Sequence, residues 1–256
     1  MKKIIAGFTT VVLAFTIAAP VFALSQSGAK DAWVQAQQVR LGADAAYRQA
    51  QLDYSKDKSP AEEQKLIDAA KALMNAALDE ARAWLEWKRI ESSEDARVPS
   101  DIKENINTDV ENNLEKISGF RADVAGVTTR AETFVVFLKI VGGYAGLLAD
   151  VARNTGAMWS SIGSQLVARA EDFEAKLRAV AADRPDLIPK LDIARSEVAL
   201  AKSKVAMAKA AYLLVKLPGT PLIKFSEGNG YLREAQLNLV QAQIQMQSVF
   251  NSLVTE

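Results

Sequence analysis

Apolar residues recur every three or four positions along nearly the whole chain after residue 26. This spacing is typical of amphipathic helices, and no segment alternates between apolar and polar residues as a half-buried strand would. Prolines fall almost only where one periodic segment ends and the next begins. The pattern predicts an all-α protein, an elongated antiparallel helical bundle with long, coiled-coil-like helices.

Boundary signals divide this pattern into six helices. Ser59-Pro60-Ala61-Glu62 and Thr129-Arg130-Ala131-Glu132 read as capping boxes, and the first also places a proline at the first helical position. Leu217-Pro218-Gly219-Thr220-Pro221 is a turn by composition. The expected helices cover about residues 27–56, 60–91, 101–125, 129–182 with a kink or break at Asn154-Thr155-Gly156, a fifth ending near 216, and a sixth starting near 226.

Each helix carries a stripe that we expect to be buried. The fourth begins with Ala131, Phe134, Leu138, Val141, Ala145, Leu148 and Ala152. The fifth has Leu191, Ala194, Val198, Ala201, Val205, Ala208, Tyr212 and Val215. The last has Leu232, Ala235, Leu239, Ala242, Met246, Val249 and Leu253.

The most apolar internal stretch runs from Phe134 to Ala149 and contains the Gly-x-x-x-Gly spacing that lets membrane helices approach closely. Lys139 and Asp150 leave only ten uncharged residues between them, which favours a core helix covered on both sides over a membrane-inserting or surface-adsorbing segment. Close packing against a neighbour is the preferred explanation of its glycines. Residues of this stretch that are candidates for partner or membrane contact are Phe134, Phe137, Gly142, Gly146 and Tyr144.

The first 23 residues have the order of a cleavable secretory signal peptide. Lys2 and Lys3 precede an apolar run, and Val21-Phe22-Ala23 supplies small residues at the cleavage site. An uncleaved anchor and a leader cut after Gly7 are the alternatives. We therefore expect a signal peptide over 1–23, cleavage near Ala23, one domain over 24–256, and a secreted or extracytoplasmic location.

Composition restricts the chemistry. The chain has 31 basic and 31 acidic side chains, and removal of the signal leaves 29 against 31, which argues against a nucleic-acid partner. It has no His and no Cys, so the usual zinc sites, Ser-His-Asp and Cys-His nucleophile systems, lipoprotein anchors and disulfides are excluded. Adjacent carboxylates diverge around a helix and make no acid/base pair. We expect no enzyme, cofactor or metal.

The four tryptophans admit two interpretations. Trp33, Trp84, Trp87 and Trp159 would line a ligand site if they met. At helical spacing, however, aromatic residues are usually core or rim residues, which is the preferred interpretation.

Several segments of the C-terminal half resemble a family of secreted helical proteins found mainly in archaea and candidate lineages. The segments are Arg169–Leu177, Phe225–Gln236, Val98–Lys103 and Ala125–Glu132. The resemblance covers about residues 70–250 and implies an exported helical bundle, often tethered to the envelope. It supplies no catalytic or binding residues. Relatives are more charged through the fourth helix.

These observations favour a non-enzymatic exported protein that acts in envelope scaffolding or partner binding, with an envelope protein or a second copy of itself as partner. One alternative is an extracytoplasmic helical chaperone or ligand sensor. Another is a membrane-associating protein that uses residues 134–149.

Overall fold

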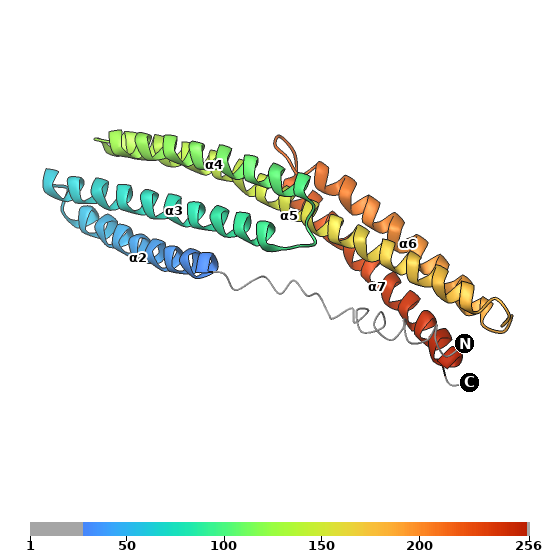
Figure 1. Ribbon diagram of the computed structural model, residues 1–256. Helices are drawn as coiled ribbons and strands as arrows, with labels where there is room; N and C mark the ends of the chain where they lie inside the picture. Colours follow the sequence, from blue (N-terminus) through green and yellow to red (C-terminus); the bar gives the residue numbers. More distant parts are fainter. Residues whose placement is uncertain (1–27, 255–256) are drawn as a thin grey trace. The chain divides into compact units, whose positions relative to one another are not determined.

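The structure, a computed structural model, describes residues 28–254, and all six of its elements are α-helices (Figure 1). No strand occurs among these residues, so the predicted all-α helical bundle is confirmed. Residues 1–23, on which the expected signal peptide falls, lie outside the described part. The helices are α2 (Gly28–Lys56), α3 (Pro60–Glu94), α4 (Ser100–Gly126), α5 (Arg130–Val180), α6 (Ile188–Leu213) and α7 (Pro221–Val254).

The helices pack into two compact units that divide between Asn154 and Thr155. The first unit holds α2, α3, α4 and the beginning of α5, and the second holds the rest of α5 with α6 and α7. The division falls at the expected kink, but α5 continues through it as one helix of 51 residues. The single domain expected over 24–256 stays a prediction.

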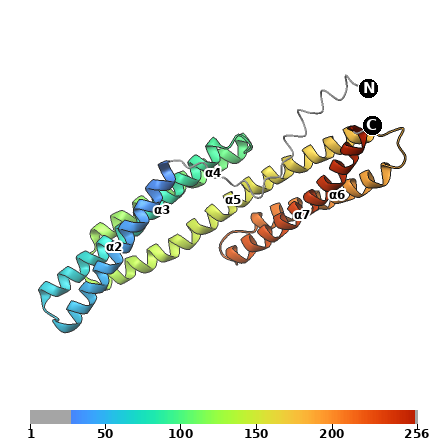
Figure 2. The same cartoon turned by 90° about the horizontal axis from the view of Figure 1, so that it is seen from below.

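In the first unit, α2 and α3 form an antiparallel hairpin, and α4 follows beside α3 (Figures 1 and 2). The core of this unit lies between α3, α4 and α5. Its buried residues include Leu85 of α3, Val110 of α4 and Ile140 of α5. Within the described residues 28–56, α2 buries no side chain fully. It is held by side-chain contacts instead, among them the stacked rings of Trp33 and Trp87, with centroids 5.1 Å apart.

In the second unit, α6 and α7 form a second antiparallel hairpin that packs with α5 (Figures 1 and 2). Every residue of the stripe expected on α6 is buried, and the stripe on α7 is buried from Ala235 to Val249. Alanine at many buried positions of α6 and α7 lets the two backbones approach closely, so small side chains still fill the space between the helices and exclude water.

Local signals explain the helix ends. The Ser59 hydroxyl accepts the Glu62 N–H at 3.4 Å, as expected, but the reciprocal half of this capping box is absent from the described residues. The Ser59 N–H instead donates to Asp57, and the Glu62 carboxylate pairs with Lys65. The last helix begins at Pro221, five residues earlier than expected, because a proline fits the first turn of a helix.

Candidate partner-binding surface

The start of α5 is fixed by a complete capping box. The Thr129 hydroxyl accepts the Glu132 N–H at 3.2 Å, and the Glu132 carboxylate accepts the backbone N–H groups of Thr128 and Thr129 at 2.8 and 3.0 Å. These backbone hydrogen bonds, together with that from the Thr128 hydroxyl, lower the pKa of Glu132. Arg130 donates to the Tyr54 hydroxyl at 3.0 Å and lies over its ring, which ties the first turn of α5 to the end of α2.

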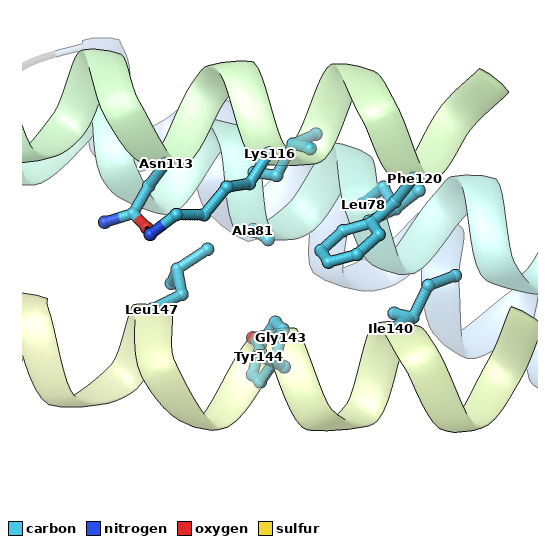
Figure 3. Close-up of a pocket in the computed structure, with 10 residues that line it drawn as sticks. Leu78, Ala81, Asn113, Lys116, Phe120, Ile140, Gly143, Tyr144 and Leu147 are labelled. Atoms are coloured by element: carbon cyan, nitrogen blue, oxygen red, sulfur yellow. Dashed lines mark hydrogen bonds between the residues drawn. The ribbon is translucent and has the colours of Figure 1, made fainter. Parts of the chain in front are cut away.

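The inward face of α5 packs against α3 and α4. Figure 3 shows its residues Ile140, Gly143, Tyr144 and Leu147 facing side chains of α3 and α4 across a small cavity. The cavity has a volume of about 10 Å3, measured as the space open to the centre of a water-sized sphere. This is about the space that one water molecule needs. Burial raises the pKa of Tyr144. This space accommodates no organic ligand, so the cavity is a packing defect of the core.

A polar network fixes the register of α5 against α4. Asn113 is almost completely buried, donates to Asp150 at 3.1 Å, and accepts from Lys116 at 3.1 Å. Arg153 bridges Asp109 of α4 at 2.8 Å and Asp150 at 2.9 Å. A buried amide with satisfied hydrogen bonds allows one alignment of two helices and penalises shifted ones. The orientation of α5 about its own axis is therefore specified by charge as well as by apolar packing.

The outward face of α5 remains open. We define it as Phe134, Val135, Leu138, Val141, Gly142 and Ala145, all exposed. Its four large apolar residues are 50–63% exposed, and Phe137 at its rim is 47% exposed. The expectation of a core helix covered on both sides is wrong, because this expected stripe faces outward. The structure buries the opposite stripe, Ile140, Leu147 and Val151, which has equally helical spacing.

The five candidate residues of this stretch divide between the two faces. Phe134 and Gly142 lie on the outward face, Phe137 lies at its rim, and Gly146 is half-buried. Tyr144 is half-buried and lines the inward cavity (Figure 3). It therefore does not belong to the surface with the others, since two positions along a helix correspond to a rotation of about 200°.

The three glycines of this stretch have different surroundings. A Cβ at position 143 would lie 2.3 Å from the Phe120 ring, so close packing explains Gly143. Positions 142 and 146 have no heavy atom of the described residues within 4 Å of an added Cβ, apart from the local helix backbone. A neighbour within the described residues therefore explains Gly143 but not Gly142 or Gly146, for which the expected close packing stays a prediction.

Sequence reasoning missed Val135, Leu138 and Val141 as surface residues. The one sequence signal for them is that this stretch is apolar on two sides of the helix. The stripe that includes Phe134 and the stripe that includes Ile140 are both apolar and have the same helical spacing. The charges that decide between the stripes pair with side chains distant in sequence. One is Asp150, which meets Asn113, and another is Lys139, which pairs with Asp123 on α4.

Two of the four tryptophans meet. Trp33 stacks on Trp87, and Trp84 and Trp87 pack in or against the core of the first unit, as expected of core or rim residues. Within residues 28–254, no three carboxylates gather in a geometry that would hold a metal ion.

The helix α5 is also the one described helix whose length and apolar character would allow it to cross a membrane. Its most apolar window of 18 residues has a mean hydropathy of 1.8 and is 22% buried.

Comparison of the chain with models of known protein families, with curated proteins and with solved structures finds no match.

Proposed function

We propose that this chain is an exported, non-enzymatic scaffold protein that binds a partner helix through the outward face of α5, and that its first partner is a second copy of itself. The observation that supports this is the row of large apolar side chains that α5 exposes. The helix behind them is held in place by its capping box, its core contacts and the network around Asp150. The export half of the proposal rests on the sequence of residues 1–23.

The outward face complements itself. Its first part is bulky, with Phe134, Val135 and Leu138. Val141 lies near its centre, and its last part is nearly flat, with Gly142 and Ala145. Two antiparallel copies that cross near residue 140 place the bulky part of each on the flat part of the other. Such a pairing is isologous, so residue 138 of one copy meets residue 142 of its partner and the reverse. It also supplies the close neighbour that Gly142 lacks within its own chain.

The size of this face sets the expected affinity. From the exposed fractions of its four large apolar residues, we estimate an exposed area of about 450 Å2, which is within the range of the largest patch on a typical monomer. Pairing two copies would bury about 900 Å2 in total, below the roughly 1,200 Å2 at which specific, stable interfaces begin. We therefore expect a weak, reversible dimer.

Sedimentation velocity of the purified chain over a range of concentrations tests the proposal. The wild-type chain should show a concentration-dependent dimer. Leu138→Lys should abolish it, because a lysine would be buried without a partner. Leu41→Lys is the matched control, because Leu41 on α2 is about as exposed, 47% against 51%, and lies outside the outward face. A monomer at all concentrations, or equal effects of both variants, would contradict self-association.

A second candidate function is adsorption to a membrane through the same face, favoured by the apolar window of α5. The inward face is occupied by α3 and α4, so this candidate requires α5 to lie in the interface with only its outward face among the lipids. Flotation with neutral phosphatidylcholine vesicles separates the two. A chain that floats, and stops floating as Leu138→Lys but not as Leu41→Lys, would favour adsorption over dimerisation.

A further inference from the structure

The turn between α6 and α7 carries a second exposed apolar cluster, in the other unit of the chain. We define the turn tip as Leu213, Leu214, Leu217, Leu222 and Ile223, which are 47–67% exposed. Leu213 is the last residue of α6 and Leu214 follows it, Leu222 and Ile223 lie in the first turn of α7, and Leu217 lies in the loop between these helices. Figure 1 shows this loop between α6 and α7. The cluster therefore lies at one end of the α6–α7 hairpin and is exposed.

The turn tip is not a fragment of unfinished core. The space beneath it is filled by Tyr212 and Val215, which are fully buried, and by Phe225, whose ring lies 5.8 Å from that of Tyr212. The Tyr212 hydroxyl donates to Asn229 of α7 at 2.7 Å, which joins the two arms of the hairpin. The base is thus packed and hydrogen-bonded, and the leucines stand outside it.

The unpaired charge in the chain segment around the turn tip is positive. Between Glu197 and Glu227 the chain contains five lysines and no acidic residue. Lys202, Lys204 and Lys224 pair with carboxylates from outside this segment. Lys209 and Lys216 have no ion-pair partner among the described residues, and both are exposed. The first turn of α7 has no acidic residue either, so the positive end of its dipole is not neutralised there.

We propose that the turn tip docks this protein on a lipid bilayer that contains anionic lipids. The leucines and Ile223 enter the boundary between headgroups and acyl chains, and Lys209 and Lys216 contact the phosphates. Exposed apolar side chains beside two lysines without ion-pair partners in the described chain suit a deformable anionic surface, which offers an apolar layer and phosphates together. The proposal is independent of the outward face of α5, because no residue is shared.

Vesicle flotation of the full chain tests this site. Wild-type protein should float with vesicles of phosphatidylcholine and phosphatidylglycerol and remain at the bottom with phosphatidylcholine alone. Near an anionic surface each lysine contributes roughly a five-fold gain in partitioning. Lys209→Gln with Lys216→Gln should therefore lower binding about 25-fold, and the control Lys58→Gln on the loop before α3 should leave it unchanged.

A second pair of variants tests the apolar part. Leu217→Asn with Leu222→Asn should lower binding about ten-fold or more, since each side chain loses its transfer from water. Leu237→Asn with Ile244→Asn is the matched control on the exposed side of α7. The proposal is overturned if the wild-type chain does not float, or if the turn-tip pair and the control pair lower binding equally. It is also overturned if binding is lost only when Leu138 of α5 is replaced by Lys. Retained helical circular dichroism in each variant excludes unfolding as the cause.

Discussion

Gly142 and Gly156 both lie inside α5, and the structure predicts opposite effects of alanine at the two positions. At position 142 an added methyl group meets open space. Alanine there removes only the conformational penalty of a glycine inside a helix, so the free energy of unfolding should rise by about 0.5–1 kcal/mol.

At position 156 an added Cβ would lie 2.2 Å from Cγ and Cδ1 of Tyr212. The ring has little room to move, because the backbone of Gly228 on α7 is also packed against it and its hydroxyl is hydrogen-bonded to Asn229. A Cβ added to Gly228 would lie 2.5 Å from Cε1 of Tyr212. Overpacking of this kind costs about 1–3 kcal/mol, against a gain of up to about 1 kcal/mol in helix propensity. We expect Gly156→Ala to lower the free energy of unfolding by about 1–2 kcal/mol.

Urea unfolding followed by circular dichroism and tryptophan fluorescence measures both variants at a dilute concentration, where self-association does not contribute. The expected separation between them is about 2 kcal/mol, well above the error of such measurements when the slopes agree. If alanine stabilised the chain equally at both positions, the claim that Gly156 exists to admit the Tyr212 ring would be refuted.

Three further predictions concern groups within the two units. Burial raises the pKa of Tyr212 above its ordinary value of 10.0, so its contribution to stability is complete below pH 10 and is lost as the pH rises further. Tyr212→Phe should remove this alkaline dependence and lower the free energy of unfolding by about 1 kcal/mol at neutral pH. Urea unfolding measured at a series of pH values tests both effects. Hydrogen bonds from Thr128 lower the pKa of Glu132, so its contribution to stability is present above the ordinary glutamate pKa and is lost as the pH falls through the lowered value. Glu132→Gln should therefore reduce the loss of unfolding free energy at acid pH. An unchanged acid side of the stability profile would contradict the role of the capping box. Asn113→Ala should destabilise the first unit by about 1–3 kcal/mol in thermal or urea unfolding, because half-buried Asp150 loses a hydrogen-bond donor and the buried amide is removed. A neutral effect would show that the network does not hold α5.

The helices were predictable from the sequence because their signals are local. Three-four spacing placed the buried stripes of α6 and α7, and the Thr129–Glu132 motif placed the start of α5. The start of α7 was misplaced because Pro221 was assigned to the turn together with Pro218 and Gly219, whereas it occupies the first position of the helix.

The candidate surface was predictable only in part, because burial depends on partners far away in the chain. The Phe134–Ala149 stretch was identified, but the face of α5 that points outward is decided by Asn113 and Phe120 of α4, which no periodicity relates to it. The turn tip was missed for the same reason. A leucine-rich turn has the composition of a small core, and the sequence does not show that Tyr212 and Val215 already fill that core.

Single-cysteine crosslinking tests the central claim, antiparallel self-association through the outward face of α5, most directly. The chain has no cysteine, so each variant reports on one position. In a pairing that crosses near residue 140, the two copies of position 141 are offset by about 3 Å along the helix axis, and those of position 134 by about 18 Å. A disulfide requires Cα atoms within about 7 Å.

Under mild oxidation, Val141→Cys should therefore form a disulfide-linked dimer, and Phe134→Cys should not. Val39→Cys on α2, which is similarly exposed, serves as the control for random collision. Crosslinking at both 134 and 141 would indicate a parallel pairing, and crosslinking at 141 no faster than at 39 would contradict self-association through this face.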